Sequence, residues 1–287
     1  MTIKRIIYRG YIRLLEKLCL IKSARNCFKA NLLLQPLPDG NKNTDIVTIA
    51  FNNDKIIPIH VRYMKKYFLD EHTHIIADNS TDKVISDRIK EYCLEEGVPY
   101  IRLPKNYHNG SRSHATAMNW VSKHIIGIRR PAFFGFTDHD LFPIKPVSLM
   151  KILRDQHVYG PIRVRGGGKY WYISAIYCFF DFEYVKNKGL DFMPARYDSD
   201  KNNYLDTGGG NWPRIYSNMD RTNMIFCDER VVKVGEGNDR HNDYVELFDN
   251  NFLHTINGAE RQYATEDAHL SKTYMLQKLI DQFECEC

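Results

Sequence analysis

The stretch Ala132-Phe-Phe-Gly-Phe-Thr-Asp-His-Asp140 decides the fold, because five apolar or small residues run straight into two aspartates. The run is short and aromatic-rich and lies between Pro131 and Pro143. These features favour a buried strand of a parallel sheet over a helix. Alternate residues of a strand point to the same side. Asp138 and Asp140 therefore leave the carboxyl end of the strand together, where open α/β sheets bind their ligands.

The two carboxylates impose a chemical requirement of their own. Like charges this close repel unless a cation or a shared proton neutralises them. Hard oxygen ligands in this arrangement suit Mg²⁺ or Mn²⁺ that accompanies a phosphate-bearing substrate. We therefore predict Asp138 and Asp140 as metal ligands, with Mn²⁺ or Mg²⁺ as the cofactor. An isolated Asp-x-Asp is also common in solvated turns, so the prediction depends on the segments around it.

Strand and helix patterns alternate upstream of this stretch. Ser80 or Thr81 is expected to cap the second helix and Gly97 to end it. The alternation predicts an α/β fold with a doubly wound, mostly parallel sheet flanked by helices. The strand patterns cover residues 45–51, 74–77, 98–103 and 132–136, and the helix patterns cover 56–68, 80–96 and 113–126.

Residues 1–35 form a distinct basic segment. They hold eight Lys and Arg residues against one acid, in a chain with a net charge of +5. Apolar residues from Ile3 to Ile21 recur every three or four positions beside a row of arginines, which predicts an amphipathic basic helix. Such a helix suits the surface of an anionic membrane or packs on the body of the protein. No aromatic groove pattern accompanies the charge, so we expect no nucleic-acid partner.

Composition sets the organisation of the rest of the chain. Residues 36–43 are interrupted by two prolines and a glycine and are interpreted as a linker before one domain, 44–287. Seven scattered cysteines favour a reducing compartment. No apolar run approaches the roughly 20 residues that span a bilayer. We therefore expect a cytoplasmic protein, held at the cytoplasmic face of the membrane if the basic helix binds lipid.

Four segments together resemble the nucleotide-diphospho-sugar glycosyltransferases. The implied fold is the Rossmann-like GT-A fold, and the likeness is greatest to the large inverting family 2. The resemblance covers residues 44–145, about half of the chain. The segments are Thr48-Ile-Ala-Phe-Asn-Asn53, Ile76-Ala-Asp-Asn-Ser-Thr-Asp82, Arg102-Leu-Pro-Lys-Asn106 and Phe136-Thr-Asp-His-Asp140.

The resemblance implies a reaction and a set of roles. It implies metal-dependent transfer of a sugar from a nucleoside-diphosphate sugar, with a UDP-sugar as the expected donor, to a glycan or lipid-linked acceptor in bacterial surface polysaccharide synthesis. Residues 44–145 would bind the nucleotide sugar and residues 146–287 the acceptor. Asp138 would reach the ribose or the metal, and Asp140 would ligate the metal. The other residues expected to bind the nucleotide sugar are Thr48, Phe51, Asn52, Asp78 and Ser80.

The second half contains a glycine-rich stretch, Leu205-Asp-Thr-Gly-Gly-Gly-Asn-Trp-Pro213. Three glycines let the backbone approach a ligand and leave N–H groups free for its oxygens, and a helix is expected to start near Trp212. We predict Asp206 as the general base, although the stretch lacks the acid pair usual in family 2 and other aspartates compete. The competitors are Asp198, Asp200 and Asp220, and the predicted acceptor contacts are Trp171, Gly208, Gly209 and Trp212.

His254 is the candidate for a third metal ligand. It lies on a short apolar segment, 251–258, ahead of a polar turn. Several metal-dependent GT-A enzymes place a histidine late in the catalytic domain, and imidazole is an acceptable ligand for Mn²⁺. His241, on what the sequence suggests is a mobile loop, is the alternative.

Two other classes of protein remain open from the sequence. A metal-dependent nucleotidyltransferase or phosphohydrolase acting on a sugar nucleotide would use the same two aspartates. Residues 51–54, however, lack the glycine and the basic residue expected after the first strand of a nucleotidyltransferase, and a phosphohydrolase would need more ligands near Asp138. A non-catalytic sugar-binding module would not need the carboxylates.

Overall fold

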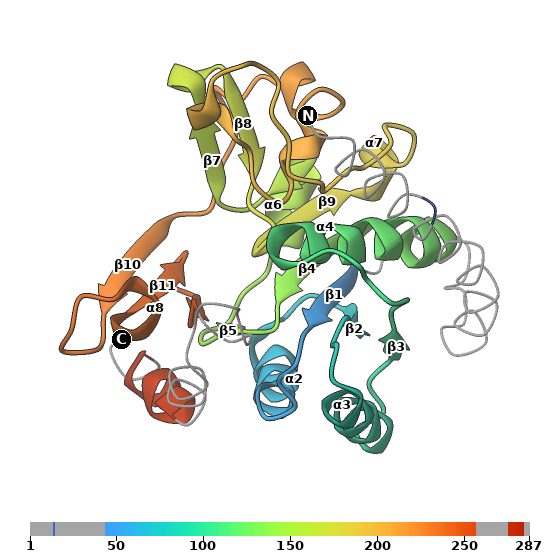
Figure 1. The fold of residues 1–287 in the computed structure, drawn as a ribbon, viewed down its shortest axis with the longest axis vertical. Helices are drawn as coiled ribbons and strands as arrows, with labels where there is room; N and C mark the ends of the chain where they lie inside the picture. The colour runs from blue at the N-terminus through green and yellow to red at the C-terminus, as the bar shows by residue number, and fades with distance from the viewer. Residues whose placement is uncertain (1–13, 15–43, 257–274, 284–287) are drawn as a thin grey trace.

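The computed structural model describes residue 14, residues 44–256 and residues 275–283 (Figure 1). The basic helix expected in residues 1–35, apart from residue 14, and the linker 36–43 lie outside the described residues. The amphipathic character of the leader and the domain boundaries therefore stay predictions.

A six-stranded sheet forms the centre of the molecule, in the order β3-β2-β1-β4-β9-β6 (Figure 1). The first four strands of this order are parallel, and β9 is antiparallel to both of its neighbours. The strands are β1 (Thr44–Ala50), β2 (His72–Asp78), β3 (Tyr100–Arg102), β4 (Phe133–Asp138), β6 (Val158–Tyr159) and β9 (Tyr177–Asp181).

Helices cover both faces of this sheet, which confirms the predicted fold class. Side chains of β1 alternate: Val47 and Ile49 pack in one core with α4, while Ala50 packs in another with α2 and α3. The helices are α2 (Ile56–Tyr67), α3 (Lys83–Glu95) and α4 (Gly110–Val121), the last continued by a π-helical turn (Ser122–Ile126) and α5 (Gly127–Arg129).

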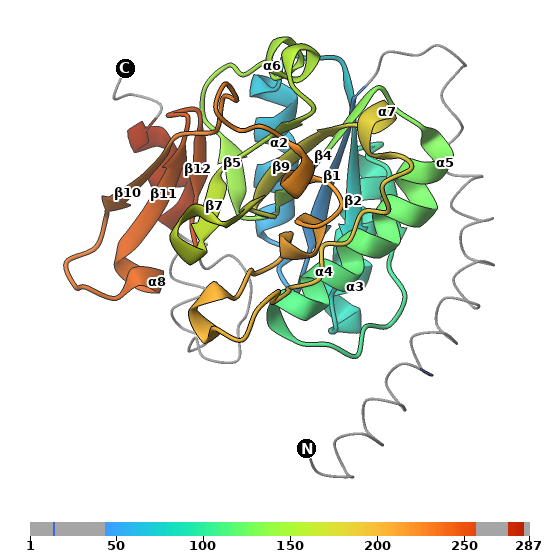
Figure 2. The same cartoon turned by 90° about the horizontal axis from the view of Figure 1, so that it is seen from above.

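A second sheet, antiparallel and four-stranded, lies beside the first (Figure 2). Its order is β10-β11-β12-β5, and β5 follows β4 after a two-residue turn. Residues 275–283 are helical, and Leu276, Leu279 and Ile280 pack in the core that this sheet shares with α2 and α3. The strands are β5 (Leu141–Pro143), β10 (Glu229–Lys233), β11 (Tyr244–Phe248) and β12 (Phe252–His254).

The structure corrects two details of the sequence prediction. Asp82, not Ser80 or Thr81, caps α3, because its carboxylate accepts the N–H groups of Val84 and Ile85. No α-helix starts at Trp212, where the chain instead leaves a 3₁₀ turn, Gly209–Asn211. The other elements are α6 (Met150–Asp155), the β7 (Ile162–Arg165) and β8 (Tyr170–Ile173) hairpin, α7 (Phe182–Val185), α8 (Arg240–Asp243) and 3₁₀ turns at Gly166–Gly168, Lys201–Asn203 and Tyr216–Asn218.

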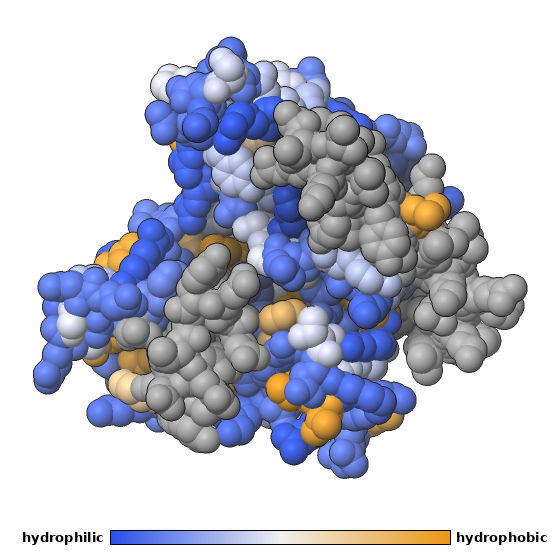
Figure 3. Space-filling view, in the orientation of Figure 1, coloured by the Kyte–Doolittle hydropathy of each residue, from blue (hydrophilic) through white to orange (hydrophobic). Residues whose placement is uncertain are grey.

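The described surface carries no sign of a membrane-spanning element. Among the described residues, no helix combines the length and the apolar character that crossing a bilayer requires. On the face shown in Figure 3, apolar residues outside the grey atoms form small separate patches on a mostly hydrophilic surface. Scattered apolar residues of this kind are ordinary for a protein surface.

Candidate metal centre at the junction of two sheets

Asp138 lies at the topological switch point of the central sheet. From β1 the chain proceeds through β2 to β3 on one side and returns to β4 on the other. Asp138 is the last residue of β4 and pairs with Ile49 near the end of β1. The crevice outside the carboxyl ends of two such strands is where open α/β sheets bind ligands. The sequence prediction that Asp138 reaches this edge is confirmed.

The structure brings the three predicted metal ligands together. One ligand atom from each of Asp138, Asp140 and His254 lies within 4.8 Å of the others. His254 arrives from the second sheet, because β12 pairs with β5 in the register His254 to Leu141. Thr255 N donates to Asp140 O at 3.0 Å and fastens the two segments one residue further along. The site is thus built at the junction of the two sheets.

The donor set fits a divalent cation. Two carboxylates and one imidazole are ligands that Mn²⁺ accepts, and carboxylates suit Mg²⁺. His254 Nδ1 lies 2.7 Å from Glu246 Oε2, so this carboxylate accepts a hydrogen bond from the ring N–H on that side. His254 Nε2 then faces Asp140 Oδ1 at 3.4 Å. A ligand histidine whose second nitrogen donates to a carboxylate is the usual arrangement around protein-bound metals.

The charges around His254 compensate one another. Burial alone would lower the pKa of His254, but the charge of Asp140 and hydrogen bonds to Asp140 and Glu246 raise it to about 10. Burial would likewise raise the pKa of Glu246, but the bond and charge of His254 and Arg240 lower it to about 2. These contacts favour a protonated His254 between Asp140 and Glu246, and a cation bound at Nε2 would displace the proton on that nitrogen.

His114 is a further neighbour of Asp138. Its Nε2 lies 3.2 Å from Asp138 Oδ1, at an angle that makes no hydrogen bond. It projects from the first turn and a half of α4, next to the exposed Arg112. The amino-terminal end of α4 therefore faces the metal ligands.

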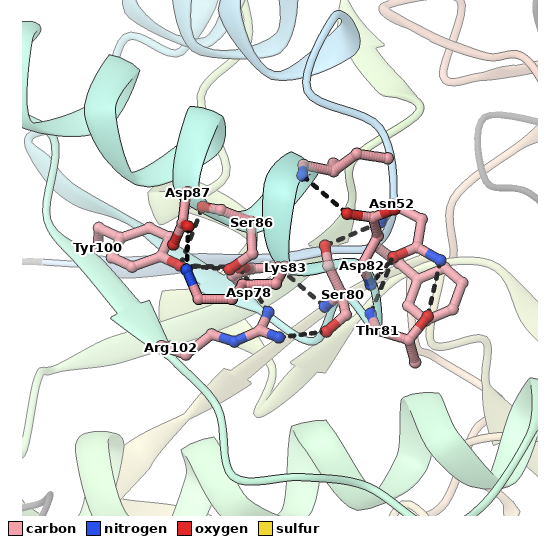
Figure 4. A network of polar contacts seen from close by, with 12 residues as sticks. Asn52, Asp78, Ser80, Thr81, Asp82, Lys83, Ser86, Asp87, Tyr100 and Arg102 are labelled. Carbon is pink, nitrogen blue, oxygen red and sulfur yellow. Dashed lines mark hydrogen bonds and ion pairs between the residues drawn. The ribbon is translucent and has the colours of Figure 1, made fainter.

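Asp78 is the centre of a polar network at the end of β2 (Figure 4). The side chain is fully buried, and its carboxylate accepts four hydrogen bonds. Burial would raise the pKa of Asp78, but the hydrogen bonds, chiefly from Ser80, hold it below its usual value. The carboxylate is thus committed to the protein itself, and direct contact with a base or ribose stays a prediction that this burial disfavours. The donors are Ser80 N, Ser86 Oγ, Tyr100 OH and Arg102 Nη1.

Asn52 ties the end of β1 to the turn after β2 (Figure 4). Its φ of 45° is left-handed, a conformation that asparagine adopts more readily than most residues. Asn52 Oδ1 accepts the N–H groups of Thr81 and Asp82, and Asn52 N donates to Ser80 Oγ at 2.8 Å. Asn52 and Ser80 therefore lie together at the sheet edge, where both are buried, and their contact with a nucleoside stays a prediction.

Phe51 and Thr48 are placed differently from each other. Phe51 N donates to His139 Nδ1 at 3.0 Å, which links the end of β1 to the Asp-x-Asp turn. Thr48 is fully buried, so its burial argues against the predicted contact with the nucleoside. Its hydroxyl lies within 2.9 Å of three side-chain atoms, His60 Nε2 of α2 and, in the sheet, His74 Nε2 and Thr137 Oγ1.

The glycine-rich turn is used for packing. Gly208 N, Gly209 N and Gly210 N donate to Phe192 O, Asp206 O and Met193 O. The expectation that these N–H groups are free for a ligand is therefore wrong. A Cβ on Gly208, whose φ is 99°, would lie 2.7 Å from Ile173 O, so close backbone packing requires glycine here. Gly208 and Gly209 are buried, and neither has a free N–H group that could bind the sugar acceptor.

The aromatic acceptor contacts divide between core and surface. Trp171 is 3% exposed and packs against Trp212, Tyr216 and Phe226. Its ring faces are occupied by the core, which corrects the prediction that it stacks on a sugar. Trp212 is half-buried and stays a candidate.

Asp206 has an exposed side chain whose Oδ1 accepts Thr207 N. The rival aspartates Asp198, Asp200 and Asp220 accept N–H groups of their own turns. His241, the alternative metal ligand, is exposed on α8 and is not in the three-ligand group. His254 is therefore the preferred third ligand, while the choice of Asp206 over the other aspartates stays a prediction.

Comparisons with known proteins give similarity at the level of the fold. No family model matches the chain, and no curated protein matches it. The structure is similar to that of the mannosyltransferase PcManGT from Pyrobaculum calidifontis in complex with GDP-Man and Mn²⁺, at 12% identity and a TM-score of 0.40, over 62% of this chain and 59% of that one. It is also similar to TarS from S. aureus, at 14% identity and a TM-score of 0.37, over 52% of this chain and 30% of that one.

We predict that acid destabilises the protein through His60. Burial lowers the pKa of His60 to about 3, whereas histidine in an unfolded chain has a pKa near 6.5. Between these values the unfolded state holds a proton that the folded state does not. The free energy of unfolding should therefore fall as the pH decreases from about 6.5 towards 3, by up to ~1.4 kcal/mol per pH unit from this group.

Urea unfolding of the wild type and of His60→Asn at pH 6.5 and 5.0 measures this term. The variant should be less stable at pH 6.5 but should lose ~2 kcal/mol less between the two pH values. His241→Asn, at an exposed position, is the matched control and should keep the wild-type slope. Equal slopes for the wild type and His60→Asn would contradict the assignment.

Proposed function

We propose that this protein is a metal-dependent glycosyltransferase, which transfers a sugar from a nucleoside-diphosphate sugar to a glycan or lipid-linked acceptor. The observation that carries the proposal is the meeting of Asp138, Asp140 and His254 within 4.8 Å at the switch point of a mostly parallel sheet. This is the position at which such sheets bind phosphate-bearing ligands. The sequence resemblance to family 2 of the GT-A enzymes supports the same assignment.

The proposed roles follow from where each side chain lies. Asp138, Asp140 and His254 would hold Mn²⁺ or Mg²⁺. When bound, such an ion supplies positive charge that stabilises the departing diphosphate. Asn52 and Ser80, held together at the ends of β1 and β2, would contact the nucleoside. Asp78 would act through the turn that it holds in place.

The finer description comes from the sequence resemblance. It favours a UDP-sugar as donor and a role in bacterial surface polysaccharide synthesis at the cytoplasmic face of the membrane. Which nucleobase and which sugar are bound depends on individual hydrogen bonds in the pocket, since a single hydroxyl group can distinguish two substrates.

The general base is proposed to be Asp206. Thr207 Oγ1 donates to Ser111 O at 3.1 Å, which fastens this turn to the first turn of α4. The same helix carries His114 beside Asp138. An exposed carboxylate on a turn anchored at this end of α4 is placed to deprotonate an acceptor hydroxyl.

The phosphohydrolase alternative is weaker. Within residues 44–256 and 275–283, the three-ligand group is the only cluster of its kind. Two-metal phosphate hydrolysis needs a second set of ligands about 3.5–4 Å from the first metal. The described part of the chain does not offer that set.

We predict that a nucleoside diphosphate stabilises the protein only together with the metal ion. Thermal unfolding with UDP, GDP, ADP or CDP, each with and without Mn²⁺, should show one nucleotide, expected to be UDP, raising Tm in the presence of the ion. Asp140→Ala should keep the fold, abolish the combined shift and abolish transfer, because the ion loses a buried ligand. Asp155→Ala, an exposed carboxylate on α6, is the control. Full activity of Asp140→Ala, or of wild type in excess chelator, would refute the metal role.

Asp206→Asn should lower the transfer rate by roughly 10²–10⁴-fold, the usual contribution of a positioned base. The Mn²⁺-dependent nucleotide shift should persist, because Asp206 lies on the acceptor side. Initial rates at saturating donor measure the effect. If Asp220→Asn loses activity while Asp206→Asn keeps it, the assignment of the base is wrong.

The basic leader is proposed to bring the enzyme to anionic membrane. Deletion of residues 1–35 removes eight basic residues and should weaken binding to phosphatidylserine-containing vesicles in a sedimentation assay, because each basic residue near an anionic surface contributes about 1 kcal/mol. Binding to neutral phosphatidylcholine vesicles is the control. Unchanged binding to anionic vesicles after the deletion would remove the membrane argument.

A further inference from the structure

Glu246 is a buried carboxylate for which the fold alone gives no reason. It is 2% exposed and lies in β11 between Val245 and Leu247, which pack in an apolar core. Burying a charge is costly unless it is paired and hydrogen-bonded. Glu246 has two partners, one on each oxygen: Oε1 accepts Arg240 Nη2 at 2.8 Å and Oε2 accepts His254 Nδ1 at 2.7 Å.

The strand register produces the contact with His254. β11 and β12 are antiparallel, and Glu246 pairs directly with His254. Directly opposed residues present their side chains on the same face of the sheet. The imidazole therefore cannot turn its Nδ1 towards Asp140 without breaking this pair, and Nε2 is the nitrogen that faces the carboxylate cluster.

Arg240 reaches the other oxygen of Glu246 from α8. Its side chain is 65% exposed while that of Glu246 is 3% exposed. The loop before β11 is folded around Asp243, whose carboxylate accepts Gly237 N and Asp239 N. A structured loop thus places a cation from the surface against a buried carboxylate.

We propose that Glu246 is a positioning residue that fixes His254 as a metal ligand through Nε2, and that Arg240 holds Glu246 in place for this task. The inference rests on the proposed function, because it concerns the same cation. It adds two residues to the site, neither of which touches the cation or the substrate. By holding one ring orientation, Glu246 lowers the cost of ordering His254 when the cation binds, and the carboxylate raises the basicity of the ligand.

The test measures Mn²⁺ binding directly, by the electron paramagnetic resonance signal of free Mn²⁺ during titration. Glu246→Gln should weaken Mn²⁺ binding about 10- to 100-fold, as loss of such an outer partner usually does. Glu229→Gln is the matched control. Glu229 lies on β10, the strand next to β11, and its carboxylate pairs with Arg163 and not with a histidine. The control should bind Mn²⁺ as the wild type does.

A second measurement separates positioning from folding. Tm without metal reports the structural cost of each variant, and the rise in Tm on adding Mn²⁺ reports the site. For Glu246→Gln the rise should shrink, and saturating Mn²⁺ should restore the nucleotide shift. If the wild type binds Mn²⁺ and Glu246→Gln binds it equally well, the positioning role is overturned while the proposed function stands. If the wild type binds no Mn²⁺, both fail.

Arg240→Gln tests the same chain of contacts from the exposed side, where folding is not at risk. Removing a cation near the site would tighten Mn²⁺ binding if only charge mattered. Loss of the hold on Glu246 should instead weaken it several-fold. Unchanged or tighter binding would overturn the role of Arg240, and weaker binding in this variant supports the proposal even if Glu246→Gln does not fold.

Discussion

The mutual repulsion of Asp138 and Asp140 is the constraint on which the rest of this site depends. Their carboxylates are brought together by a strand end and a two-residue turn, and something positive must lie between them and the buried groups around them. In the described structure His254 supplies that charge, because its Nε2 faces Asp140, its Nδ1 faces Glu246, and these two contacts raise its pKa to about 10. The second sheet therefore contributes the counter-charge that makes the edge of the first sheet tenable.

The ends of β1 and β2, which are proposed to bind the nucleotide, are held by many hydrogen bonds. Asp78 is saturated by donors from its own turn, α3 and β3, and Asn52 links the ends of β1 and β2. A prebuilt edge of this kind reduces the ordering cost of binding. The loss of conformational freedom occurs during folding, so the turn that holds Asn52 and Ser80 is already ordered.

The sequence predicted the first half of the fold well, because short apolar runs alternating with amphipathic segments are local signals, although the cap of α3 was misassigned. Asp138 and Asp140 followed from a strand end and the chemistry of paired carboxylates, and His254 followed from the resemblance to metal-dependent GT-A enzymes. Glu246 was missed because its meaning depends on the register of a hairpin, although a lone acid in Tyr-Val-Glu-Leu-Phe248 before Asp-Asn-Asn251 is a signal that a cross-strand partner exists. The glycine-rich turn and Trp171 were wrongly predicted to contact the acceptor. The sequence does not show that other parts of the chain, Ile173 and Tyr216, pack against them.

The ladder between β5 and β12 has a consequence for the order in which this protein matures. Residues 138–140 and residue 254 are more than a hundred positions apart in the chain, and only the docking of β12 joins them. A nascent chain can fold the parallel strands and still lack the third ligand until nearly the whole domain has left the ribosome. Under the proposed function, the three-ligand site would therefore be complete only after β12 has paired with β5.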